Sequence, residues 1–327
     1  MIRKSLTAAV LLCLGMTCSA GASAQAADAA AFPTKQVRLV VPFAAGGASD
    51  IIARLVAQKL GELWGQTMLV DNRGGASGAI GLTFVAKSPA DGHTLILGGP
   101  ATLSGPPALN PKVPYDNLKD FEHVSIVATF PSVLAVNPAV AKTLPELIAV
   151  LKANPGKYTY ATSGNATSTH LIAELFKWMT GTNIVHVPYK GTAPGITDLI
   201  AGQVSMTFAP VNVVMPHVQA KRLNAIGITS AKRSSELPEI PAIAEVVPKF
   251  EADSWICISA PAGTPRAIVQ KISTDVRRMF RDPETVRKFK ELDLTPVGST
   301  PEELVRVVRE DTERWRNIGR IANIQME

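Results

Sequence analysis

The sequence predicts an α/β protein built from two similar lobes with a ligand cleft between them. Short apolar, β-branched runs alternate with amphipathic helical patterns along the chain, which is typical of largely parallel sheets. Two strand–loop–helix units begin about 120 residues apart, near residues 37 and 158. The chain of 327 residues also exceeds the usual size of a single hydrophobic core.

The first unit joins a strand, a glycine turn and a helix. Residues 37–41 are an apolar run typical of a buried strand, and the glycine pair at 46–47 allows turn conformations that other residues resist. Ser49 or Asp50 is expected to cap a helix with one apolar face. Such a helix start presents unpaired N–H groups and a positive dipole end, which together favour anions.

The rest of the first lobe continues the alternation of strands with turns and helices. A glycine-rich turn at 74–78 leads into a helix that ends near Lys87, and Arg73 beside the turn is a candidate for a structural salt bridge. Further strands are expected at 67–70, 94–97 and 124–129.

The second lobe repeats the opening arrangement. Phe130-Pro131 interrupts two strand-like runs, so the first crossing between lobes is expected there. Thr143 or Leu144 begins a helix with proline in its first turn. The strand at 158–162 then leads into a polar loop at 163–168 and an amphipathic helix. Further strands are expected at 184–187, 204–208 and 223–229, and helices at 196–200 and 211–221.

The chain returns to the first lobe through a strand-like run at 254–261. Two closing helices are expected to open at Pro265 and Pro301. The predicted boundaries are 32–129 plus 252–327 for the first lobe and 130–251 for the second. Clefts between lobes are common ligand sites. The tryptophans fall within these elements and are expected in the core: Trp64, Trp178, Trp255 and Trp315.

Composition narrows the function. An apolar content of 46% and a charged content of 18% indicate a globular chain rather than a disordered one. The basic residues within 277–290 alternate with glutamates at helical spacing, which favours a solvated helix face over a nucleic-acid surface. The histidines show no metal-ligand spacing, and no nucleophile elbow or acid–base constellation is present. We therefore expect no metal, no cofactor, no nucleic-acid partner and no enzymatic activity.

The N-terminus is typical of a cleaved secretion signal at residues 1–24. A basic pair precedes an apolar run at 6–14, which is too short for a permanent membrane anchor. Small residues favour cleavage after Ala24, with Ala26 as the second choice. Cleavage would leave Cys257 as the sole cysteine, so an internal disulfide is impossible, and its place in an apolar strand indicates an inert buried thiol.

Five short motifs span nearly the whole chain after the signal. They are VVPFAAGGASD at 40–50, VDNRGGASG at 70–78, SGNATSTHL at 163–171, HVPYKG at 186–191 and APAGTP at 260–265. Together and in this order they resemble the signatures of the tripartite tricarboxylate transporter receptors, also called the Bug family.

The resemblance implies a type II-like, two-lobed periplasmic binding protein. It implies a monomeric periplasmic receptor for a small carboxylate, either a di- or tricarboxylate or an aromatic carboxylate, with transporter membrane subunits as partners. The carboxylate would lie between loops 43–50 and 163–170, bound by N–H groups, hydroxyls and ordered water. The ligand-binding residues implied are Phe43, Ala44, Gly46, Gly47, Ser49, Asp50, Thr102, Ser163, Asn165, Thr167, Ser168, His170 and Ala209.

Several of these residues also have an ordinary structural interpretation. Loop 43–50 matches neither phosphate-loop nor dinucleotide glycine spacing and could be a simple tight turn. Asp50 would repel an anion, so it fits a role in capping the helix and fixing the loop. The polar side chains at 163–168 also form local caps in many proteins. His170 is as consistent with packing as with the cleft.

The chain departs from the family pattern at several positions. Ala45, Ala48 and Ala166 stand where proline or glycine is common, and Ala209-Pro210 stands where an aspartate often occurs. Loss of that aspartate removes a partner for a ligand ammonium, so we expect amino acids to be poor ligands. The alternative function is a secreted α/β enzyme that acts on a small carboxylate in the same cleft.

Overall fold

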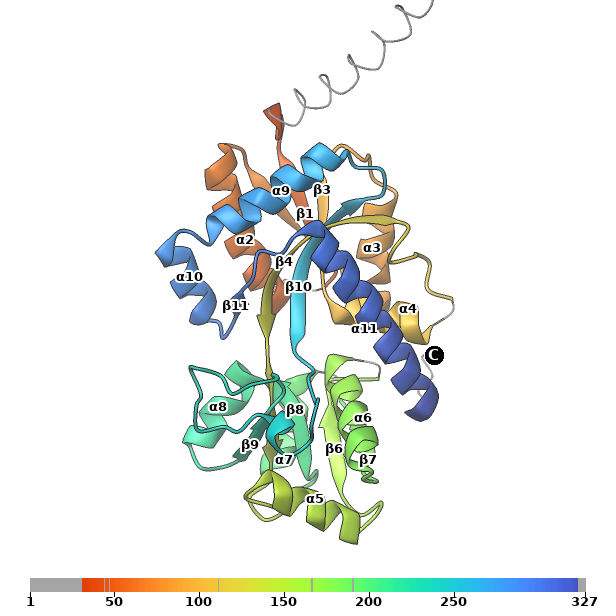
Figure 1. The fold of residues 1–327 in the computed structure, drawn as a ribbon, viewed down its shortest axis with the longest axis vertical. Coiled ribbons are helices and arrows are strands. Elements are labelled where there is room, and N and C mark those ends of the chain that lie inside the picture. The colour runs from red at the N-terminus through yellow and green to blue at the C-terminus, as the bar shows by residue number, and fades with distance from the viewer. Residues whose placement is uncertain are drawn as a thin grey trace, which may run out of the picture.

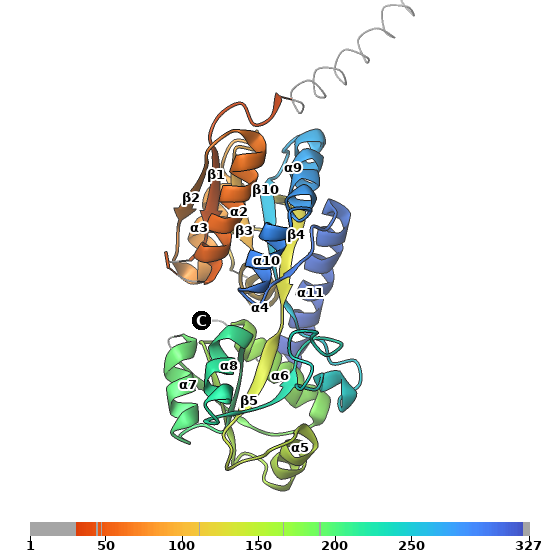
Figure 2. The ribbon, with the colours of Figure 1, turned by 90° about the vertical axis from the view of Figure 1, so that its left-hand side faces the viewer.

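The protein consists of two lobes stacked along its long axis (Figures 1 and 2). The structure is a computed structural model that describes residues 31–322, apart from residues 44, 47, 111, 166 and 190. The expected signal, residues 1–24, lies outside the described residues. Each lobe contains one β-sheet, which confirms the two-lobed α/β prediction.

The first lobe contains a six-stranded sheet in the order β11-β4-β10-β3-β1-β2. Strand β1 pairs in parallel with β2 and β3, whereas β10 runs antiparallel to β3 and β4. The strands are β1 (Val37–Val41), β2 (Met68–Asn72), β3 (Thr94–Gly98), β4 (Phe121–Phe130), β10 (Ser254–Pro261) and β11 (Thr295–Pro296).

Helices cover both faces of this sheet. One core cluster joins the sheet to α2 and α9, and another joins it to α3 and α11. Adjacent residues of β1 point to opposite faces, with Leu39 in the first cluster and Val40 in the second. The helices are α2 (Ala48–Trp64), α3 (Ala79–Ala86), α4 (Gly105–Leu109), α9 (Arg266–Met279), α10 (Pro283–Lys290) and α11 (Pro301–Ala322).

The second lobe contains a five-stranded sheet in the order β7-β6-β8-β5-β9. Strand β6 pairs in parallel with β7 and β8, whereas β5 runs antiparallel to β8 and β9. The strands are β5 (Ser132–Val136), β6 (Thr159–Thr162), β7 (Val185–Pro188), β8 (Met206–Pro210) and β9 (Asn224–Ile228). The helices are α5 (Leu144–Ala153), α6 (Ser168–Thr180), α7 (Thr192–Ile200) and α8 (Val211–Gln219).

The sheets are mixed rather than largely parallel, so that part of the prediction is wrong. The chain enters the second lobe directly from β4 into β5 and returns directly into β10 (Figure 1). Strands β5 and β10 therefore arrive without a crossover helix, and both run antiparallel to their neighbours.

The two crossing segments are joined to each other by Thr229. The Ser132 N–H donates to the Thr229 hydroxyl at 2.8 Å, and that hydroxyl donates to Asp253 Oδ1 at 3.1 Å. Helix α11 connects the lobes a third time, because its residues Trp315 and Ile318 belong to the core cluster of the second lobe. Figure 1 shows α11 extending from the first lobe alongside α6.

One of the four tryptophans is exposed rather than packed in a core. Trp255 and Trp315 are buried and Trp64 packs against the first core, as expected. Trp178 is 54% exposed, so the expectation of a core position is wrong there. It lies in the last turn of α6, on the outer surface of the lobe.

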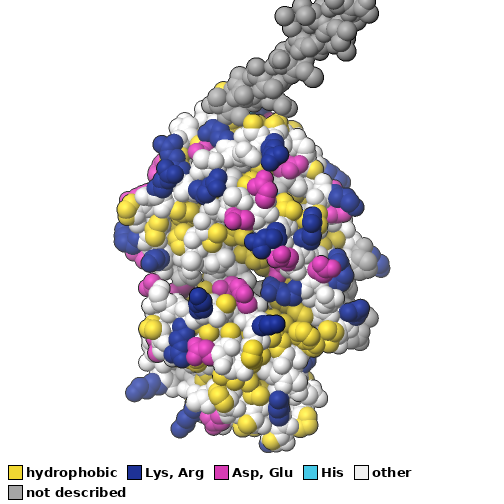
Figure 3. All heavy atoms as spheres, in the orientation of Figure 1, with side chains coloured by type: hydrophobic (Ala, Val, Ile, Leu, Met, Phe, Trp, Pro, Cys, Tyr) yellow, Lys and Arg dark blue, Asp and Glu magenta, His cyan; other side chains and the backbone are white. Residues whose placement is uncertain are grey.

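The basic residues near the C-terminus form a solvated surface. Arg287 pairs with Glu291 at 2.8 Å and Lys288 with Glu284 at 2.9 Å, both within the same helical region. On the face in Figure 3, basic side chains are interspersed with acidic ones. Within residues 31–322, no helix combines the length and the apolar character needed to cross a membrane.

Candidate functional site

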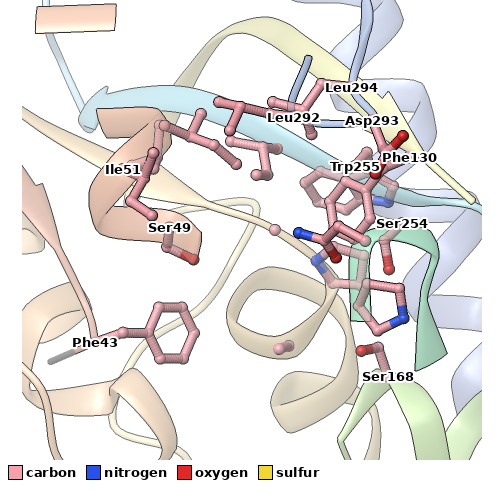
Figure 4. Close-up of a pocket in the computed structure, with 18 of the residues that line it drawn as sticks. Phe43, Ser49, Ile51, Phe130, Ser168, Ser254, Trp255, Leu292, Asp293 and Leu294 are labelled. Carbon is pink, nitrogen blue, oxygen red and sulfur yellow. The ribbon is translucent and has the colours of Figure 1, made fainter. Parts of the chain in front are cut away.

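A cavity of about 440 Å³ lies between the two lobes (Figure 4). The first lobe contributes residues from α2, from the segment after β3, and from β10, and the second lobe contributes the starts of three helices. The lining includes Phe43, Ser49, Thr102, Phe130, Ser168, Thr192, Asn212, Ser254, Ile256, Leu292, Asp293 and Leu294.

The first turns of four helices border this cavity. Ser49 lies in the first turn of α2, and Ser168, Thr192 and Val211 are the first residues of α6, α7 and α8. Each helix start carries about half a positive charge and N–H groups without partners inside the helix. The arrangement thus concentrates positive potential and hydrogen-bond donors without a basic side chain, and no lysine or arginine of the described residues lines the cavity.

Three of the four α-helices described in the second lobe, α6, α7 and α8, begin without side-chain caps. Their N-cap residues are Thr167, Gly191 and Pro210, and none of these side chains bonds to the helix start. By contrast, α5 and α10 begin away from the cavity and are capped by Thr143 and Asp282. Helices α3, α4 and α9 also lack such a cap, so what distinguishes α6, α7 and α8 is that their uncapped starts border the cavity. First-turn N–H groups of α6, α7 and α8 therefore have no partner from their own helix or from an N-cap side chain, and such groups are suited to bind an anion.

Asp50 organises the first loop from inside the helix. Helix α2 begins at Ala48, so Asp50 lies in its first turn rather than at the N-cap. Its Oδ2 accepts hydrogen bonds from the Gly46 N–H at 2.9 Å and from Arg54 Nε at 3.0 Å. The Arg54 side chain and the Gly46 N–H hold the pKa of this carboxyl below its usual value. Asp50 does not line the cavity, and its carboxylate instead holds the first loop against the start of α2.

The other candidate residues of the first loop are Phe43, Ala44, Gly46 and Gly47. Phe43 lines the cavity at 36% exposure, and its carbonyl accepts from Asn72 Nδ2 at 3.2 Å. Gly46 is exposed with a φ of 83°, where glycine is favoured. Ala44 and Gly47 lie outside the described residues.

Thr102 lies in the cavity wall contributed by the turn after β3. Its hydroxyl accepts from the Gly99 N–H at 3.2 Å and donates to the Gly99 carbonyl at 3.1 Å. The Thr102 carbonyl accepts a hydrogen bond from the buried Tyr115 hydroxyl. The Thr102 side chain is thus held in place by its own turn, where it forms part of the cavity surface.

The second loop is held by a compact set of hydroxyl contacts. Thr169 Oγ1 accepts from the Ser163 N–H at 3.0 Å and lies 3.0 Å from Thr167 Oγ1. Thr167 Oγ1 also donates to the Gly164 carbonyl at 2.8 Å. Ser168 lines the cavity, whereas Asn165 is exposed. Most hydroxyls of this loop therefore stabilise the turn that orients the start of α6.

His170 lies behind this loop rather than in the cavity lining. It stacks on His186 with ring centroids 3.9 Å apart, and His186 Nε2 lies 2.6 Å from the Thr162 hydroxyl. Burial, reinforced by Lys177, lowers the pKa of His170 to about 4. Burial, reinforced by His170, lowers the pKa of His186 to about 4. The two stacked, neutral imidazole rings support loop 163–168 from below.

Two other sequence-based candidates occupy core or structural positions. Ala209 is fully buried in a core cluster of the second lobe. Arg73 pairs with Asp71 at 2.9 Å and stacks over Phe84, so the predicted structural salt bridge is confirmed. Cys257 is buried, and burial raises its pKa to about 12, which makes it a poor nucleophile. The described residues contain no cluster of three or more potential metal ligands.

Sequence reasoning missed several lining residues. Thr192 directly follows Gly191, the N-cap of α7, and Asn212 is the second residue of α8, which begins immediately after Pro210 at the end of β8. Glycine before Thr192 and proline before Val211 mark the two helix starts in the sequence, but not their approach to the cavity. Asp293 reaches the cavity from the segment between α10 and β11, and no local pattern marks it.

Comparison with known proteins identifies the family. A family model described as "Tripartite tricarboxylate transporter family receptor" matches residues 52–324. The chain belongs to this family. The resemblance inferred from the five motifs is thereby confirmed.

Relatives and solved structures are similar to the chain over most of their length. A protein in the tcbD-tcbE intergenic region of Pseudomonas sp. strain P51 is 39% identical over 311 residues, 94% of this chain and 91% of that protein. A structure of Rpa4515 from R. palustris with adipate has a TM-score of 0.79 and 37% identity, covering 90% of this chain and 99% of that one. MatC from Rhodopseudomonas palustris with bound malate has a TM-score of 0.74 and 29% identity, covering 88% and 99%.

Proposed function

We propose that the protein is a periplasmic receptor that binds a small carboxylate between its lobes and delivers it to the membrane subunits of a tripartite transporter. The observation that carries this proposal is the convergence of four helix starts on one cavity. The similarity to receptors whose structures hold adipate and malate supports a carboxylate ligand. Residues 1–24 would direct export and be removed.

The ligand carboxylate would accept hydrogen bonds from first-turn N–H groups of α6, α7 and α8. The hydroxyls of Ser168 and Thr192 lie in the same lining and can add donors. Ser49 and Phe43 would approach from the first lobe, Ser49 at the start of α2 and Phe43 as an apolar wall. Among the proposed ligand-binding residues, Asp50 would act by fixing the first loop, Ser163 and Thr167 by fixing the second, and Thr102 by fixing the turn after β3.

Closure of the lobes would enclose the ligand. We place the first lobe at residues 32–129 plus 252–327 and the second at 130–251. The chain passes from the first sheet to the second between Phe130 and Ser132, and it returns to the first sheet before Ser254. The two segments that cross between the lobes are hydrogen-bonded through Thr229 and would act together as the hinge. Helix α11 packs on both lobes and would limit how far they separate.

A secreted enzyme acting on the same ligand class is less consistent with the site. Such an enzyme needs a nucleophile or acid with a base within hydrogen-bond reach. The described lining residues include several hydroxyls, but Asp293 is the single titratable side chain among them. The receptor function is therefore the better account of this cavity.

A ligand screen tests the proposal. The protein without residues 1–24 would be unfolded, dialysed and refolded to remove any retained ligand, then screened by thermal shift against carboxylates, aromatic acids and amino acids. A ligand at a hundred times its Kd is expected to stabilise the native state by about 2.7 kcal/mol. We expect a saturable shift with at least one carboxylate and no comparable shift with α-amino acids. A full panel without any shift, or turnover of a bound acid, would contradict the receptor function.

A further inference from the structure

The end of the cavity formed by the segment after α10 differs in character from the helix starts. Leu292, Asp293, Leu294 and Phe130 lie there (Figure 4), and Ile256 belongs to the same cavity lining. Four of these five side chains are hydrocarbon, so they can solvate an apolar ligand body but offer nothing to a charged group. We call this wall, residues 130, 256 and 292–294, the distal wall.

Asp293 is the only charged side chain of the described residues in the cavity lining. No lysine, arginine or histidine of the described residues forms an ion pair with it, and the nearby Lys290 instead pairs with Glu236 at 3.6 Å. Partial burial, reinforced by Glu236, raises the pKa of Asp293 above its ordinary value. The carboxyl is thus held in the wall without a neutralising partner.

In the described residues, the cavity lining therefore combines hydrogen-bond donors at four helix starts with a single carboxylate, that of Asp293. A compact cavity of about 440 Å³ is on the order of 10 Å across, the scale of a small ligand. A dicarboxylate bound at the helix starts would bring its second charge close to Asp293. At such separations, like charges near a protein surface repel strongly enough to weaken binding by roughly ten-fold or more.

We propose that the distal wall rejects a second carboxylate, so that the ligands of this receptor are monocarboxylates with an apolar, uncharged far end. This inference rests on the receptor function proposed above and specifies its ligand class. It distinguishes the chain from its relative whose structure contains adipate, a dicarboxylate.

Asp293 can be neutralised with little structural disturbance. Its φ of 56° lies in the left-handed region, which asparagine tolerates as well as aspartate does. Asp293→Asn therefore keeps the shape and backbone conformation and removes the charge. Glu236→Gln is a matched control, because it removes a neighbouring carboxylate that does not line the cavity.

Calorimetric titration of matched acids tests the inference. Hexanoate against adipate, benzoate against terephthalate and butanoate against succinate would each be measured on the refolded protein and both variants. In the wild type we expect the monocarboxylate of the binding pair to bind at least about ten-fold more tightly. Asp293→Asn should reduce that ratio to about three-fold or less by strengthening the dicarboxylate, whereas Glu236→Gln should leave it within about two-fold of wild type.

The outcomes separate this inference from the receptor function. A dicarboxylate that binds the wild type as tightly as its monocarboxylate partner, or a ratio that Asp293→Asn leaves unchanged, would overturn the inference and leave the receptor function standing. Failure of every acid to bind all three proteins would overturn both.

Discussion

Replacing Ser168 with aspartate is expected to weaken carboxylate binding by at least about 100-fold while the fold stays intact. Ser168 is the first residue of α6 and lines the cavity, and the N-cap leaves this helix start without a bonding side chain. A carboxylate at this position would occupy the donors intended for the ligand and repel the ligand's own charge. The same substitution places an acid in the first helical turn, which stabilises a helix by about 0.3–1 kcal/mol.

The combination of lost binding and preserved or increased stability is the distinctive result. Calorimetry would measure binding, and urea denaturation would measure the free energy of unfolding. Ser168→Asn is the matched control, because it has nearly the same size without the charge. We expect it to weaken binding by less than about ten-fold, since the backbone N–H groups remain. Equal binding by the aspartate and asparagine variants would show that the ligand's charge lies elsewhere.

Replacing Trp315 with alanine is expected to cost about 3–5 kcal/mol of unfolding free energy. Trp315 lies in α11, which begins in the core of the first lobe, yet it is 3% exposed within the core cluster of the second lobe. Truncation would leave a cavity there and detach the helix that links the lobes. Urea unfolding monitored by circular dichroism would give the loss.

Trp178 supplies an internal control for this measurement. It lies in α6 of the second lobe, against which α11 packs, but it is 54% exposed, so its replacement with alanine should cost less than about 1 kcal/mol. Similar losses for the two variants would mean that α11 does not contribute to the core of the second lobe in solution.

The sequence predicted the features that depend on local pattern. The alternation of strands and helices, the chain crossing at Phe130-Pro131 and an α5 start at Thr143 or Leu144 follow from periodicity, proline and capping chemistry, and the structure places the α5 cap at Thr143. The loops singled out at 43–50 and 163–170 both contribute to the cavity, through Phe43, Ser49 and Ser168.

The features that depend on which distant segments meet in the folded protein were not predictable from local sequence patterns. Thr192 and Asn212 join the site because the ends of β7 and β8 meet those of other strands, which no local pattern encodes. Asp293 reaches the cavity from a segment more than 100 residues beyond Ser168 in the chain. The antiparallel placement of β5 and β10 likewise follows from the two direct lobe crossings rather than from any strand's composition.

The most direct test of the central claim is an amide NMR titration of the refolded protein with a carboxylate that binds it. If helix starts bind the carboxylate, the largest ¹H and ¹⁵N shift changes should occur at the N–H groups of Ser168, Thr192 and Asn212. A bound carboxylate that leaves these amides unchanged and shifts only residues elsewhere would contradict the claim that helix N-termini, rather than basic side chains, hold the ligand.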